Sequence, residues 1–81
     1  MNTKMERGAD PSEFLAVMSG IHERASLAGI PTSVALQTKL VVNGIQDALP
    51  HAYASCVHME ELYMEKVEGI MRRESIRLEA L

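Results

Sequence analysis

The residues with the most chemical potential lie between positions 51 and 61. His51, Cys56 and His58 are of types that bind metals or act in catalysis, and the pair Glu60–Glu61 follows them. On one helix His51 and His58 share a face, but Cys56 points roughly 140° away from His51, because each residue turns a helix by about 100°. The three ligand types therefore do not converge within one chain, and the usual short zinc spacings are absent.

We accordingly expect no metal site and no cofactor in a single chain. One arrangement stays open, in which His51 and His58, together with a carboxylate, hold a metal across an interface between two copies. Nucleophilic catalysis would need a serine or cysteine held against a base and an oxyanion site. Cys56 and His58 are two residues apart on a predicted helix and face different ways, so we expect the protein not to be an enzyme.

The elements that must position these residues are helices, because no stretch alternates at period two for long enough to form a strand. Asp10 is a suitable N-cap, Pro11 fits the first helical position, and an apolar stripe then recurs at helical spacing as far as Ala28. Gly29 suits the position just after a helix end, and Pro31 cannot continue the helix. These signals predict a first helix over about 11–28.

The rest of the chain predicts two more helices and an all-α fold. A second helix runs over about 32–49, and Pro50 breaks the chain before a long third helix over about 50–81. The architecture is thus a helical hairpin followed by a long C-terminal helix. Residues 1–9 lack periodicity and are expected to form a flexible arm, which leaves 10–81 as a single helical domain.

The middle of the chain is unusually poor in charge. Of its 19 charged residues, two, Lys39 and Asp47, lie between positions 25 and 59. A helix on the surface of a monomer normally presents one charged face to water. In addition, a helix over 50–81 would reach roughly 48 Å, against about 27 Å for each of the other two, and would overhang them. Both features predict self-association into a homodimer or a higher oligomer.

The predicted function is that of a non-enzymatic protein–protein interaction module that acts as an oligomer, of the adaptor, chaperone or inhibitor type. Its partners would be itself and another protein, docked through an apolar helical groove. The expected contact residues lie on the second helix and the first half of the third. They are Leu36, Leu40, Tyr53, Val57, Tyr63 and Met64.

The alternative is a small DNA-binding transcriptional regulator. Residues 24–35 partly resemble a helix-turn-helix, with a glycine turn between two helices. The would-be recognition helix, however, offers few groups for base and phosphate contacts, and the segment is nearly neutral. Those groups are Ser33, Gln37, Thr38 and Lys39. Nucleic acid is therefore the less favoured partner.

Composition sets the remaining expectations. The chain is 47% apolar, which is too much for intrinsic disorder, and its net charge of −3 argues against a general nucleic-acid or anionic-membrane binder. It has no apolar run long enough to span a bilayer and no secretory leader pattern. Its one cysteine, Cys56, is expected to be a small buried side chain. We therefore expect a cytoplasmic protein without membrane contact.

Overall fold

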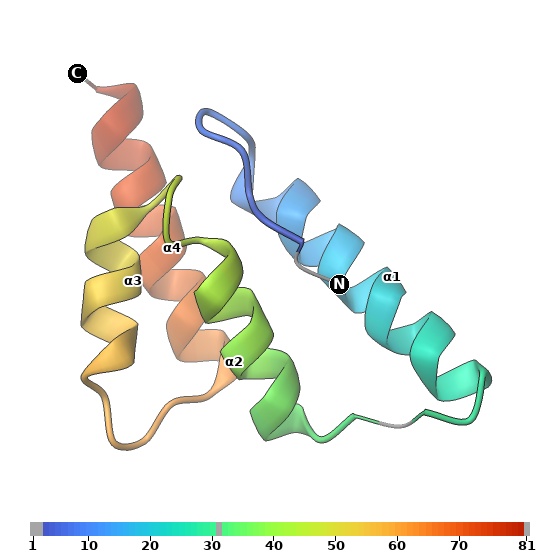
Figure 1. Ribbon diagram of the computed structural model, residues 1–81. Coiled ribbons are helices and arrows are strands. Elements are labelled where there is room, and N and C mark those ends of the chain that lie inside the picture. Colours follow the sequence, from blue (N-terminus) through green and yellow to red (C-terminus); the bar gives the residue numbers. More distant parts are fainter. Residues whose placement is uncertain (1–2, 31, 81) are drawn as a thin grey trace.

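The computed structural model describes residues 3–30 and 32–80, which form four helices joined by short loops (Figure 1). Within these two ranges there is no strand, so the predicted all-α fold is confirmed. The helices are α1 (Pro11–Leu27), α2 (Val34–Gly44), α3 (Pro50–Val57) and α4 (Met64–Glu79).

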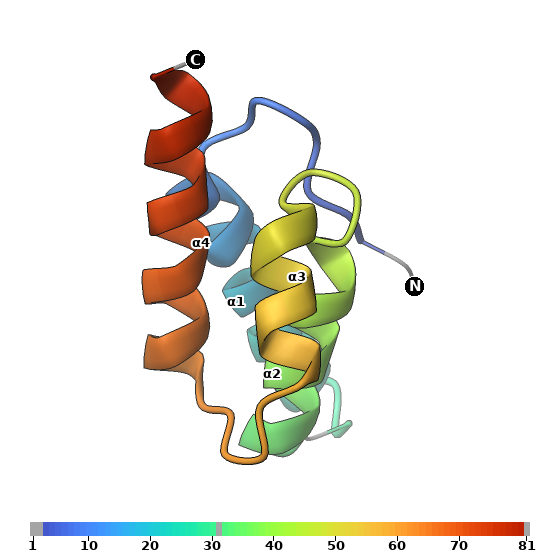
Figure 2. The ribbon, with the colours of Figure 1, turned by 90° about the vertical axis from the view of Figure 1, so that its left-hand side faces the viewer.

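The prediction of three helices was wrong at the C-terminal helix. That helix is divided in two, because α3 ends at Val57 and a loop over 58–63 separates it from α4. The turn lets α4 run back beside α3, where Val67 and Met71 become fully buried (Figure 2). One continuous helix would have left these two side chains in water, so tertiary burial outweighs local helix propensity here. The predicted overhang disappears with the turn.

The second helix is also shorter than predicted, since α2 ends at Gly44 and not near residue 49. The chain continues in turns, in which the N–H of Leu49 donates to the carbonyl of Ile45 over 2.8 Å. Ile45 and Leu49 are both buried in the core. The break before Pro50 is confirmed, because Pro50 is the first residue of α3.

The limits of α1 follow the sequence signals closely. The Asp10 side chain accepts the N–H of Ser12 at 2.9 Å, and Pro11 opens the helix. At the other end Gly29 has a φ of 82°, and the N–H of Ile30 reaches back to the carbonyl of Ala25 at 2.8 Å. A left-handed glycine followed by this hydrogen bond is the usual way to close a helix. Pro31, the predicted stop residue, lies outside the described ranges.

All four helices contribute to one hydrophobic core. α1 supplies Phe14 and Met18, and α2 supplies Val41 and Val42. The apolar positions of α3 and α4 add four more members to the cluster. These are Ala52, Cys56, Val67 and Met71. The core therefore forms within one chain, and it covers the inner face of α2.

The segment before α1 also takes part in this core. Met5 is 4% exposed, and its N–H donates to the carbonyl of Gly44 at 2.8 Å. This contact joins the start of the chain to the end of α2. Residues 1 and 2 lie outside the described ranges, and the expected flexibility of residues 1–9 stays a prediction.

Gly44 generates a prediction, because the chain packs closely against it. A Cβ atom there would lie 2.6 Å from Cζ of Phe14 and 2.8 Å from the Thr3 carbonyl oxygen. We expect Gly44→Ala to lower the free energy of unfolding by about 1–3 kcal/mol through overpacking. Urea denaturation followed by circular dichroism measures this change.

Gly20→Ala is the matched control, because its Cβ would meet nothing nearer than Nη1 of Arg24 at 3.8 Å. Gly20 lies inside α1, so this substitution is expected to raise stability by about 0.5–1 kcal/mol. Equal effects of the two substitutions would contradict the close packing at Gly44.

Candidate functional site

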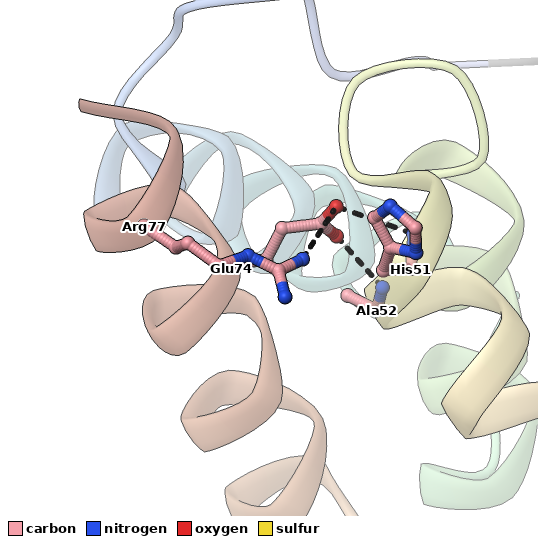
Figure 3. Close-up of polar contacts among 4 residues, drawn as sticks. All are labelled: His51, Ala52, Glu74 and Arg77. Atoms are coloured by element: carbon pink, nitrogen blue, oxygen red, sulfur yellow. Dashed lines mark hydrogen bonds and ion pairs between the residues drawn. The ribbon is translucent and has the colours of Figure 1, made fainter. Parts of the chain in front are cut away.

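A buried carboxylate fixes α3 against α4 (Figure 3). Glu74 of α4 is 4% exposed, and its two oxygens accept the backbone N–H groups of His51 at 3.2 Å and Ala52 at 2.7 Å. The N-cap residue of α3, Leu49, makes no side-chain cap. Glu74 therefore supplies from another helix the acceptor that the start of α3 lacks. The positive end of the helix dipole favours the negative charge at this place.

Sequence reasoning missed this role of Glu74. A signal was present, since Leu49 before Pro50 leaves the first N–H groups of the helix without a local acceptor. That signal predicts a partner from elsewhere in the chain but does not say which of the acidic residues it is.

The fixed position of α3 creates a groove between α2 and α3, with a volume of about 460 Å³. Its walls are mainly apolar, and Lys39 and Glu60 are the charged residues among those that line it. The other lining residues come from both helices and from the loop after α3. They are Ala35, Thr38, Val42, Asn43, Tyr53, Cys56, Val57, Met59 and Leu62. We call this the α2–α3 groove.

The structure brings together two of the six residues predicted to form the interface. Tyr53 and Val57 both line the α2–α3 groove. Leu36 and Tyr63 are exposed but do not line it. Leu40 and Met64 are half-buried and pack against the core of their own chain.

Exposed apolar side chains occur in and beside the two loops along one edge of the molecule. In Figure 1 the loop between α1 and α2 and the loop between α3 and α4 both lie along the lower edge of the molecule, at opposite sides of it, with the start of α2 between them. Six large exposed apolar residues belong to these loops or to the helix ends beside them. They are Leu27, Ile30, Val34, Leu36, Val57 and Tyr63. We call this set the apolar end.

Three members of the apolar end were not predicted as contact residues. Leu27, Ile30 and Val34 lie around the turn between α1 and α2. Val34 stands seven residues before the buried Val41, a spacing that places both on one face of a helix. Its exposure depends on where the other helices lie, which helical periodicity does not show.

The residues with metal-binding or nucleophilic potential are kept apart. His51 lies in the first turn of α3 and His58 follows its last residue; both are exposed, whereas Cys56 is buried. Burial raises the pKa of the Cys56 thiol above its ordinary value, which disfavours the reactive thiolate. Across residues 3–30 and 32–80, no three His, Cys, Asp or Glu side chains are grouped so that they could hold a metal ion.

Three of the four side chains considered for DNA contact are engaged within the chain. Thr38 is buried, and its hydroxyl donates to the carbonyl of Val34 at 2.9 Å. Ser33 caps α2 by accepting the N–H of Leu36 at 3.1 Å. Gln37 donates through Nε2 to Thr32. A recognition helix needs such groups to point at bases and phosphates, so the geometry disfavours the DNA-binding alternative.

Comparisons with protein-family models, with curated proteins and with solved structures find no match. In the part of the chain that the structure describes, none of the helices is both long enough and apolar enough to cross a membrane.

The cap made by Glu74 generates a second prediction. We expect Glu74→Ala to lower the free energy of unfolding by about 2 kcal/mol or more, because two N–H groups lose a charged acceptor. Glu74→Gln keeps one acceptor oxygen and should cost less. Urea denaturation monitored by circular dichroism compares the variants.

Glu79→Ala is the control for this series, since Glu79 is an exposed residue at the end of the same helix. Its effect should stay within about 0.5 kcal/mol, as is usual at exposed positions. If Glu74→Ala unfolds at the same urea concentration as the unaltered protein, the cap does not stabilise the junction of α3 and α4.

Proposed function

We propose that the protein is a non-enzymatic, helical protein–protein interaction module that acts as an oligomer. The observation that carries the proposal is the mainly apolar α2–α3 groove, which shares Val57 with the apolar end. A concave apolar surface beside exposed apolar side chains is typical of sites that receive the apolar face of a partner.

The occupant that best fits the α2–α3 groove is an amphipathic helix of another protein. Two helices wall the groove, and a third helix can lay an apolar stripe between them. Met59 lines one part of it, and the unbranched methionine side chain adapts to partners of different shape. Lys39 and Glu60 carry opposite charges, so they can fix the direction of a partner helix through polar contacts. Adaptors, chaperones and inhibitors are the types of protein that work in this way.

Self-association is the second part of the proposal. The chain covers the inner face of α2 by itself, but Val34 and Leu36 at the start of that helix remain exposed. In the absence of another partner, a second copy can cover these side chains and remove apolar surface from water. The expected location remains the cytoplasm, because the one cysteine is a buried free thiol.

Light scattering tests the oligomeric part. We expect the average mass to rise above that of one chain as the protein concentration passes about 100 µM, which corresponds to a weak dimer. Leu36→Glu should shift the rise to higher concentration, because it places a charge in the contact. A mass of one chain throughout, up to about 1 mM, would remove self-association from the proposal.

Affinity capture with two matched variants tests the partner-binding part. Val57 and Val17 are 50% and 51% exposed, but only Val57 lines the α2–α3 groove. We expect Val57→Glu to reduce recovery of the specific partner from a lysate at least about tenfold, equivalent to 1.4 kcal/mol, because a carboxylate would be buried against an apolar helix. Val17→Glu should recover the partner as well as the unaltered protein does.

A photo-crosslinking residue at position 57 then identifies what occupies the groove. The crosslinked peptide should come from an amphipathic helix of the protein that Val57→Glu fails to recover. Recovery of the same proteins by Val57→Glu and Val17→Glu would refute a role for the α2–α3 groove in binding.

A further inference from the structure

A second groove, between α3 and α4, has a different chemistry from the first. Its volume is about 420 Å³. His51 and Ser55 line it from α3, and Arg73 and Arg77 line it from α4. Each pair is spaced by four residues, so its members are neighbours on one face of their helix. We call this the α3–α4 groove.

The remaining lining is apolar apart from one carboxylate. Ala52, Met59 and Ile70 provide the apolar surface, and the carboxylate belongs to Glu74. Both oxygens of Glu74 are already engaged by the N–H groups at the start of α3. These hydrogen bonds and the dipole of α3 stabilise its negative charge.

With two arginines and one glutamate in its lining, the α3–α4 groove carries a net positive charge. Arg77 forms an ion pair with Glu74, with Nη2 3.9 Å from Oε2, and its side chain remains 61% exposed. This distance is longer than a hydrogen bond, so the guanidinium keeps donors for another acceptor. Arg73 lies one turn earlier on the same face and is also exposed. A positive groove on a chain whose net charge is −3 favours a negatively charged ligand.

We propose that the α3–α4 groove binds a small organic oxyanion, that is, a carboxylate or a phosphate attached to an apolar body. The planar guanidinium groups of Arg73 and Arg77 match the geometry of such head groups, and they can bind them through paired hydrogen bonds. The Ser55 hydroxyl and the His51 ring add polar groups from the opposite wall. The apolar body would lie on Ile70 and Met59. The volume of the groove is in the range of small-molecule sites.

This inference goes beyond the proposed function and does not depend on it. The two grooves involve different faces of α3, since Tyr53, Cys56 and Val57 line one, while His51, Ala52 and Ser55 line the other. Met59 lines both grooves, but substitutions at the other lining residues of one groove leave the lining of the other unaltered.

Titration followed by two-dimensional NMR tests the proposal with four probes: hexyl phosphate, hexanoate, inorganic phosphate and hexanol. We expect saturable shifts at the backbone amides of Ser55, Arg73 and Arg77 with hexyl phosphate or hexanoate. Inorganic phosphate should bind more weakly because it lacks the apolar body, and hexanol should cause no saturable shift because it lacks the charge. The tighter of the two organic anions identifies the head group.

Arg73→Gln and Arg72→Gln form the matched pair of variants. Both remove one exposed positive charge from neighbouring positions on α4, but Arg72 does not line the groove. Arg73→Gln should weaken binding of the organic anion at least about tenfold, and Arg72→Gln less than about twofold. Thermal unfolding of both variants confirms that the fold is retained.

Three results would overturn the proposal. The first is that neither organic anion gives saturable shifts, and the second is that hexanol binds as well as hexanoate. The third is that the two arginine variants weaken binding equally. The last result would show a general attraction between charges and no built site. None of these results bears on capture of a partner through Val57, so the two proposals can fail separately.

Discussion

One buried carboxylate determines how the two halves of this small protein meet. Glu74 joins α4 to the first N–H groups of α3, and hydrogen bonds of this kind tolerate little displacement (Figure 3). A carboxylate buried at this point without hydrogen-bond donors would be strongly unfavourable. The contact therefore also selects the one register of α4 against α3 in which Glu74 meets these N–H groups. Both grooves depend on it, because each uses α3 as a wall.

The loop over 58–63 and the cap by Glu74 act together. The loop reverses the chain, and the cap holds the returning helix where Val67 and Met71 are fully buried. A chain of this size buries a limited fraction of its surface, so several apolar side chains stay exposed, among them those near the loops. Two features of the structure therefore account for the low charge in the middle of the sequence. Part of it is core, and part of it forms the apolar end.

The two faces of α3 differ in a way that follows from their neighbours. On one side α2 contributes apolar and uncharged polar side chains, with Lys39 as its one charge in the groove. On the other side α4 contributes Arg73 and Arg77, which line the groove beside the buried Glu74. A single short helix thus separates a surface suited to an apolar helix from one suited to an anion.

The sequence by itself determined the helical class and several helix limits. Asp10, Gly29 and Pro50 act within a few residues of their own positions, so local patterns sufficed to place these ends. Only the tertiary structure decided the break after Val57, the cap by Glu74 and the exposure of Val34. These features depend on contacts between residues far apart in the chain. Local helix propensity does not determine which distant part of the chain a segment packs against.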